Sequence, residues 1–132
     1  MKVGILGLPQ TGKKTLFGLF TGVATAVTAH ESGRVVDGIA EIRDGRFDEL
    51  VEMYRPRKAS RARINLQLYP RIEADGLRDA ALLQEMGKLD VICHLVRCFE
   101  DDAVYHARGS VDPERDIRSL NAELILQDLL YI

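Results

Sequence analysis

The sequence has few cysteines, no long apolar run and no excess of basic residues, and each shortage excludes a class of protein. Its two cysteines, Cys93 and Cys98, fall in one strand-like stretch, where geometry disfavours a mutual disulfide, and two thiols are too few for a structural zinc. No apolar run approaches the roughly 18 residues of a membrane span, and Met1-Lys2-Val3 begins a predicted strand rather than a signal peptide. We therefore expect a cytoplasmic, reduced protein with no membrane partner.

Charge and composition are those of an ordinary globular domain. The 18 Lys and Arg against 20 Asp and Glu give a net charge of −2, so no basic bias indicates nucleic acid or an anionic membrane. The 132 residues are 46% apolar and 29% charged, which is enough for a real core. No internal repeat or low-complexity tract is present. We expect a single domain over residues 1–132.

The most informative stretch is the first fifteen residues. Val3 to Leu6 predicts a buried strand, Gly7-x-x-x-x-Gly12-Lys13 a tight loop, and the apolar residues from Leu16 onward a helix. This context is typical of a P-loop, in which backbone N–H groups and a helix N-terminus attract phosphate. A glycine-rich turn with a surface lysine pair is the alternative. The candidate nucleotide-binding residues are Pro9, Gln10, Thr11, Gly12, Lys13, Lys14 and Thr15.

One position departs from the P-loop pattern. The pattern has Ser or Thr directly after the lysine, where the hydroxyl binds magnesium, and Lys14 stands there instead. Thr15 comes one step later, and one step along a helix turns a side chain by about 100°. Lys14 either replaces part of the metal's charge near the β-phosphate or points to solvent. A role for Mg²⁺ is therefore doubtful. We predict no metal ligands, and the sequence assigns no residue a catalytic role.

Three further strands are predicted. The first runs from Arg34 to Ile42 and is weakened by Gly38. The second runs from Ile64 to Tyr69 and alternates apolar with polar side chains, which indicates one wet or hydrogen-bonded face. The third runs from Leu89 to Val96 as a continuous apolar run, which suits a strand covered on both faces, with His94 as a packed core histidine.

Three further helices are predicted, which with the strands indicates an α/β protein. One follows Asp44 as N-cap and ends before Pro56, and another runs from Asp75 or Gly76 to Met86. A long helix begins at Asp112-Pro113 and carries two apolar stripes, so we expect it to pack on two sides. The stripes are Ile117, Leu120 and Leu124, and Ala122, Ile125, Leu129 and Ile132.

A basic segment joins the first of these helices to the next strand. Residues 55–63 hold five Lys or Arg in nine positions. We favour a solvated turn, and a contact with an anion or RNA is the alternative.

Three collinear blocks of the sequence resemble the YchF or Obg-like ATPase family, P-loop proteins of the translation-factor class that bind ATP or GTP. The blocks are residues 2–17, residues 44–58, and residues 90–129, the last with Val96-Arg97-Cys98-Phe99-Glu100-Asp101-Asp102 and Gly109-Ser110-Val111-Asp112-Pro113. The resemblance implies a three-layer Ras-like P-loop NTPase fold with a mixed, mostly parallel sheet. In that fold the strand near residue 39 is antiparallel to the strand near residue 66. The resemblance also implies GTP/GDP or ATP/ADP as ligand and a ribosome or translation factor as partner.

The chain departs from the family where magnesium is bound. The family reaches the metal through the hydroxyl after the P-loop lysine, a Thr in the first switch and an Asp in D-x-x-G. Here Lys14 takes the first place, Thr25 and Thr28 lie too early for the second, and the strand ending at Leu68 carries no Asp. Glu73-Ala74-Asp75-Gly76 is at best a remnant of the third. The chain also stops before the family's base-recognition strand and its C-terminal TGS domain. We therefore expect a partial G domain, either a fragment of a longer protein or a stripped-down relative.

Two functions follow from this comparison. The first is a purine nucleotide-binding domain of a YchF/Obg-like GTP-binding protein, with weak or no hydrolysis. The second is a pseudo-GTPase that binds no nucleotide and acts through protein or ribosome contacts. We also expect a homodimer, formed through the open edge of the 89–96 strand or through the 117–132 helix, because the next strand of a Ras-like sheet would lie beyond Ile132.

Overall fold

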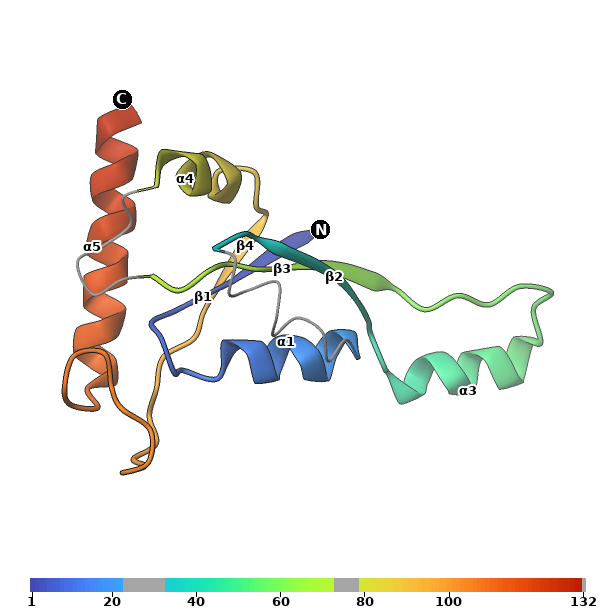
Figure 1. Cartoon of the computed structure of the whole chain (residues 1–132). Coiled ribbons are helices and arrows are strands. Elements are labelled where there is room, and N and C mark those ends of the chain that lie inside the picture. The colour runs from blue at the N-terminus through green and yellow to red at the C-terminus, as the bar shows by residue number, and fades with distance from the viewer. Residues whose placement is uncertain (23–32, 73–78, 132) are drawn as a thin grey trace.

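The computed structural model describes residues 1–22, 33–72 and 79–131, and its centre is an open four-stranded sheet (Figure 1). The strands are β1 (Lys2–Leu6), β2 (Val36–Glu41), β3 (Arg63–Leu68) and β4 (Val91–His94), in the order β2-β3-β1-β4. β1 pairs in parallel with β3 and β4, whereas β2 is antiparallel to β3, with Gly38 opposite Leu66. The mixed, mostly parallel sheet and the antiparallel pairing near residues 39 and 66 are therefore confirmed.

The helix α1 (Lys13–Thr21) covers one face of the sheet. Side chains alternate between the two faces of a strand, so every second residue of β1 and β3 meets this helix. The resulting core cluster is Ile5, Phe17, Ala40, Leu66 and Leu68, with Phe17 and Leu68 fully buried.

Gly38 lets α1 approach the sheet closely. A Cβ atom at this position would lie 2.6 Å from both the Phe17 ring and the Thr21 methyl group. The sequence predicts only that Gly38 weakens its strand, whereas the structure gives the glycine a packing role.

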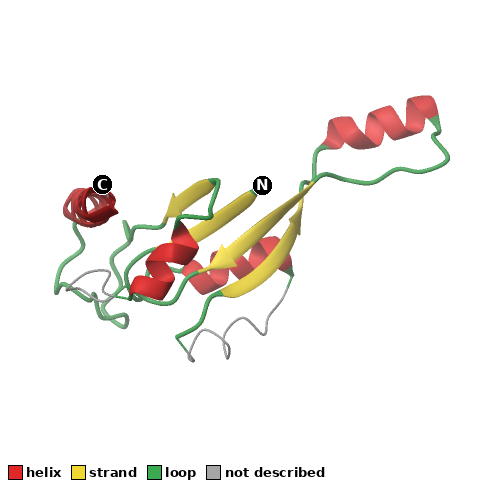
Figure 2. Ribbon diagram, turned by 90° about the horizontal axis from the view of Figure 1, so that it is seen from above, coloured by secondary structure: helices red, strands yellow, loops and turns green. Residues whose placement is uncertain are grey.

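Helix α4 (Ala80–Met86) lies over the opposite face of the sheet, and α5 (Pro113–Tyr131) stands beside the sheet, past the carboxyl ends of its strands (Figures 1 and 2). Their contact with the sheet is a second core cluster of Leu6, Tyr69, Ile72, Met86 and Leu120. On this face the Gln67 amide of β3 donates to Asp37 Oδ1 at 2.8 Å, and the hydroxyl of Tyr69, the residue after β3, donates to Gln67 Oε1 at 3.3 Å, in agreement with the predicted hydrogen-bonded face.

Two helices begin after the N-cap residue that the sequence predicts, and a third differs from the prediction. The Asp44 and Asp112 carboxylates accept backbone N–H bonds at 3.0 Å from Arg46 and Arg115, as expected of N-caps. Helix α4 begins at Ala80 and is capped by Asp79, whose backbone is extended, so the predicted helix does not run through Asp79 without a break. The predicted start at Asp75 or Gly76 lies outside the described residues.

One prediction of burial is wrong. β4 is not covered on both faces: Val91 is 45% exposed and Ile92 is 40% exposed, because β4 is a short strand at the sheet edge. Helix α5 packs through Leu120 and Leu124. Ala122, Ile125 and Leu129 of its second stripe are exposed and form the open apolar surface expected for the homodimer, and Ile132 lies outside the described residues. No helix in the described ranges is long and apolar enough to span a bilayer.

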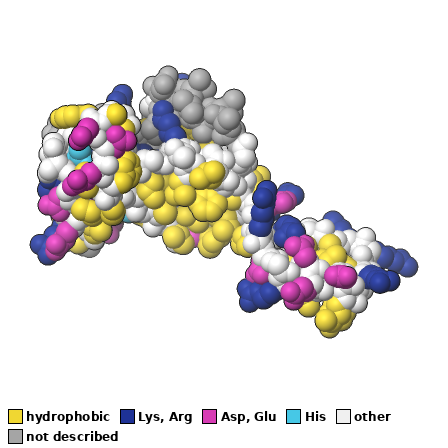
Figure 3. Space-filling model, turned by 90° about the horizontal axis from the view of Figure 1, so that it is seen from below, with side chains coloured by type: hydrophobic (Ala, Val, Ile, Leu, Met, Phe, Trp, Pro, Cys, Tyr) yellow, Lys and Arg dark blue, Asp and Glu magenta, His cyan; other side chains and the backbone are white. Residues whose placement is uncertain are grey.

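Helix α3 (Gly45–Tyr54) and the basic segment form an arm that leaves the body (Figures 1 and 2). We define the arm as residues 43–62. No residue of α3 is buried, so its predicted apolar face has no sheet beneath it. Instead Phe47 stacks under the guanidinium of Arg61, 4.9 Å from the ring centroid, and Arg61 pairs with Asp48. The arm carries charges of both signs on a narrow connection to the body (Figure 3).

Candidate nucleotide-binding site

The loop between β1 and α1 has the backbone that a phosphate-binding turn needs. Gly7 has φ +154°, and a Cβ there would lie 2.3 Å from the Leu95 carbonyl oxygen, so only glycine fits. Gly12 has φ +88° and caps α1. Gln10 also has a positive φ of 62°, which is uncommon for a residue with a side chain. The loop thus turns sharply between the end of β1 and the N-terminus of α1.

Lys13 is held inside this loop. It is 5% exposed, and its ammonium donates to the Leu8 carbonyl at 2.7 Å and to the Gly7 carbonyl. The Thr11 hydroxyl also donates to Leu8 O, at 3.1 Å. Burial lowers the pKa of Lys13 to about 8, and the nearby charges of Lys14 and Arg71 add to that lowering. At neutral pH the ammonium is charged, which favours an anion beside it.

All seven sequence-predicted site residues line one open cavity of about 270 Å³. Lys14 is half-buried in this lining, and Thr15 lines the cavity as well. The rotation from one helix position to the next therefore leaves both side chains in the site. An eighth lining residue, Arg71, was not predicted. It could have been found, because β1 and β3 are parallel neighbours and residues just past both strands must meet at one edge.

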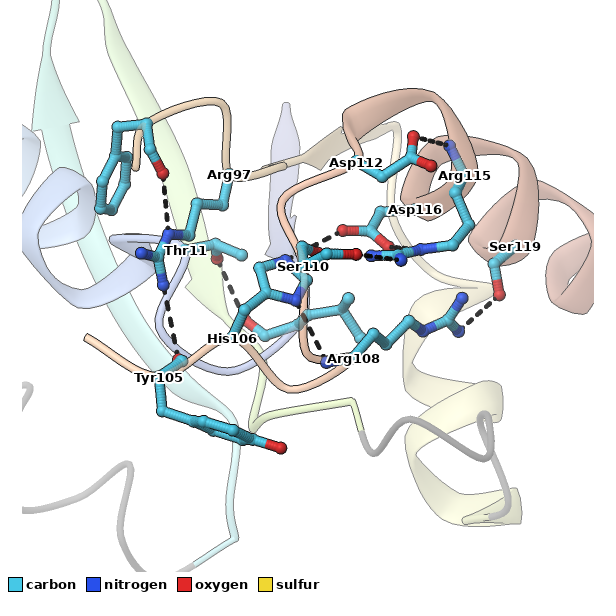
Figure 4. Close-up of polar contacts among 12 residues, drawn as sticks. Thr11, Arg97, Tyr105, His106, Arg108, Ser110, Asp112, Arg115, Asp116 and Ser119 are labelled. Carbon is cyan, nitrogen blue, oxygen red and sulfur yellow. Dashed lines mark hydrogen bonds and ion pairs between the residues drawn. The ribbon is translucent and has the colours of Figure 1, made fainter. Parts of the chain in front are cut away.

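The charged loop after β4 is folded around the side chain of Arg97. Arg97 is 2% exposed, and its guanidinium donates to the backbone carbonyls of Phe99 at 3.0 Å, Asp101 at 3.2 Å and Val104 at 2.8 Å. It also donates to the Tyr105 carbonyl at 3.4 Å (Figure 4). It also stacks on the Phe99 ring at 4.6 Å from the centroid. These contacts give Arg97, in the block of residues 90–129, a structural role: it satisfies carbonyls that an irregular loop would otherwise leave unpaired.

A buried polar cluster joins this loop to α5. Asp116 is 3% exposed and lies between His106 Nε2 at 3.3 Å and Arg115 Nε at 3.0 Å (Figure 4). Asp116 and His94 also line a small cavity of about 20 Å³ behind the P-loop. Burial lowers the pKa of His94; the carboxylate of Asp116 opposes this effect, and Lys13 reinforces it. Across the described residues, no three His, Cys, Asp or Glu side chains are grouped as metal ligands.

The sheet topology, the glycine-rich turn after β1 and the lysine at the start of α1 together define a P-loop GTPase fold. Over nearly its whole length the chain is related to the YchF/Obg-like ATPases and corresponds to a part of them.

The comparisons with known proteins give the following relatives. The chain is 36% identical to the ribosome-binding ATPase YchF of Bacillus subtilis, over 98% of this chain and 37% of the relative. It is 36% identical to Obg-like ATPase 1 of Caenorhabditis elegans, over 100% of this chain and 35% of the relative. The YchF GTPase structure of Schizosaccharomyces pombe superimposes with a TM-score of 0.62 at 27% identity, covering 97% of this chain and 36% of that one. No protein-family model matches the chain. The chain thus spans little more than a third of the length of these relatives.

Proposed function

We propose that the chain binds a purine nucleoside di- or triphosphate, ATP/ADP or GTP/GDP, through residues 9–15. The observation that carries this proposal is the buried Lys13, whose ammonium lies under a glycine-rich turn at the start of α1 and beside an open cavity. Helix N-termini and charged donors both favour phosphate there. The relatives named as ATPases and a GTPase support the same ligand class. The residues that line the cavity are of types that bind phosphate and do not select a base. Adenine and guanine nucleotides are therefore both candidates.

Lys13→Ala tests this site. Removing a charge-assisted contact to phosphate costs about 1.5–3 kcal/mol, or roughly 10- to 150-fold in affinity. The measurement is calorimetric titration of wild type and variant with ADP and GDP, with circular dichroism to show that the fold is kept. Lys58→Ala, an exposed lysine on the arm, is the matched control and should bind as wild type does. Equal affinity of wild type and Lys13→Ala would contradict the site.

We further propose weak or no hydrolysis. Phosphoryl transfer depends on positioning and on metal charge at the β- and γ-phosphates, and Lys14 stands where the metal's hydroxyl ligand is expected. Turnover of ATP and GTP by the purified chain, with and without magnesium, is the test. A magnesium-stimulated rate in the range of efficient NTPases would refute the proposal.

Association with the ribosome is proposed from the names of the bacterial relatives. The arm offers a surface for it, because Arg55, Arg57 and Lys58 are exposed there. Phosphate contacts by such residues weaken steeply with salt. Cosedimentation with ribosomes should therefore fall when all three are replaced by Ser, and fall with rising salt. Unchanged cosedimentation of the triple variant would exclude the arm.

The second candidate is an interaction module that binds no nucleotide. The observation that favours it is the apolar surface left open: Ile125 is 60% exposed and Leu129 is 63% exposed on α5, and β4 lies at the sheet edge. If wild type binds no nucleotide up to millimolar concentration, this candidate replaces the first.

A further inference from the structure

We propose that the tip of the arm, residues 53–60, binds single-stranded RNA, with its cations on the phosphates and Tyr54 stacked on a base. This inference rests on the proposed association with the ribosome and names the chemical class that the arm would contact there. It is independent of the nucleotide site, because no residue of the tip lines that cavity.

The basic segment of residues 55–63 divides into two parts in the structure. Arg61 pairs with Asp48 on α3. Arg63 pairs with Glu41 of β2 at 3.2 Å. The other three cations lie in the tip: Arg55, Arg57 and Lys58. Each of these three is exposed, and none forms an ion pair within the part of the chain that the structure describes, so their charge is available to a partner.

The tip carries no acidic side chain and stands away from the body, with Lys and Arg side chains at the far end of the arm (Figures 2 and 3). Helix α3 ends at Tyr54, and the next residue, Arg55, has φ +43° and donates its N–H to the Val51 carbonyl at 2.9 Å. Pro56 then prevents the helix from continuing. The three cations therefore lie close together on a turn that a large anionic partner can reach.

Tyr54 adds an aromatic ring to this turn. It is 74% exposed. Two helical turns earlier, Phe47 stacks under the Arg61 guanidinium, whereas no described side chain stacks on Tyr54. Proteins bind single-stranded RNA with this combination, because bases stack on the ring while Lys and Arg contact the phosphates. The bases of a duplex already stack on one another, so the ring finds a partner only in an unpaired strand.

Single-stranded RNA fits the tip better than other anionic partners do. An acidic peptide would contact the cations and leave the ring unused. An anionic bilayer would also engage Leu50 and Met53 of α3, which are 54% and 72% exposed, so vesicle binding is a separate outcome of the test. The bacterial relatives are named ribosome-binding ATPases, which favours RNA over a lipid surface.

The test is fluorescence anisotropy of a labelled single-stranded RNA of mixed sequence, titrated with the chain at several salt concentrations. The same RNA annealed to its complement is titrated in parallel. Wild type should bind the single strand at least about fivefold more tightly than the duplex, because only unpaired bases stack on Tyr54. The logarithm of the affinity should fall with the logarithm of the salt concentration with a slope of about −2, the value for three phosphate contacts on a single strand.

Variants separate the ring from the charges. Tyr54→Ala should lower the affinity for the single strand at least about fivefold at an unchanged salt slope, and Tyr54→Phe should bind as wild type does. Arg57→Ser should make the salt slope less steep by about 0.7. Tyr105→Ala removes another tyrosine, 77% exposed on the loop after β4, and is the matched control that should change nothing.

The outcomes separate the inference from the proposed function. Equal affinities for single strand and duplex, or normal binding by Tyr54→Ala, would overturn the inference. Binding of the chain to phosphatidylserine vesicles but not to RNA would overturn it as well. If wild type cosediments with ribosomes but binds no RNA, the inference fails and the ribosome association stands. If wild type binds RNA through Tyr54 but does not cosediment with ribosomes, the association fails and the RNA site stands.

Discussion

At the scale of single residues, the proposed phosphate site depends most on Lys13. Its pKa of about 8 in the free chain comes from burial first, and then from Lys14 and Arg71. A bound polyphosphate neutralises those two cations and brings its own negative charge, so the bound pKa must rise. Below about pH 8, Lys13 is therefore protonated in both the free and the nucleotide-bound chain. Above about pH 8, the chain takes up a proton at Lys13 when the nucleotide binds.

The affinity for ADP should consequently fall as the pH rises above 8, by up to about tenfold per pH unit, and be independent of Lys13 titration below pH 7. Calorimetry at pH 7 and pH 9, in buffers of different ionisation enthalpy, measures both the affinity and the proton uptake. His94 titrates below this window, because burial lowers its pKa from 6.5. An affinity that stays constant from pH 7 to pH 9 would contradict the role given to Lys13.

The same lowered pKa affects the stability of the free chain in the opposite direction. Between about 8 and 10.5 the unfolded chain holds the Lys13 proton more tightly than the folded chain does. The free energy of unfolding should therefore rise with pH over that window as far as Lys13 is concerned.

Loop residues 7–15 were recognisable in the sequence because each glycine and the lysine has a required position. Arg71 was not, because its place depends on strand order.

At the scale of elements, the close packing of α1 on β2 rests on Gly38. Gly38→Val should destabilise the fold by about 1–3 kcal/mol, because the new side chain would overlap Phe17 and Thr21 at the centre of the α1 interface. Equilibrium unfolding in urea is the measurement. Gly45→Ala is the matched control, since no atom lies within 4 Å of a Cβ there, and it should leave stability unchanged or slightly higher. A wild-type midpoint for Gly38→Val would refute the packing argument.

The elements also show what a sequence can and cannot predict. Strand β3 and the starts of α3 and α5 follow from local chemistry: alternation in β3, and carboxylates at Asp44 and Asp112 that accept N–H bonds. Burial does not follow from local chemistry. The apolar run at β4 and the apolar face of α3 both look covered in sequence, yet one lies at a sheet edge and the other on an arm.

At the scale of the whole molecule, large apolar surfaces are open to a partner. Apolar side chains gather over the side of the body on which α1 lies, where Leu19 is 78% exposed and Phe20 is 57% exposed (Figure 3). Helix α5 presents Ile125 and Leu129, and β4 has a sheet neighbour on one side only within the described residues. Patches of this kind mark interaction surfaces.

We predict a homodimer built on α5 or the β4 edge, with a two-fold axis because that closes the contact. Sedimentation at roughly tens of micromolar should give the dimer mass, and Ile125→Glu should shift it to the monomer if α5 is the interface. Leu50→Glu makes the same change on the arm and should leave the mass unchanged. A wild type that sediments as a monomer would contradict the prediction, and a dimeric Ile125→Glu would move the interface away from α5.

The central claim is that the turn between β1 and α1 binds the phosphates of a nucleotide. The most direct measurement is a titration of the isotope-labelled chain with ADP and GDP, followed by the chemical shifts of its assigned backbone amides. The account predicts that the largest shifts fall on the amides of residues 10–15, with Arg71 among the side chains that respond. No shift in that segment at millimolar nucleotide, or shifts confined to the arm, would contradict it.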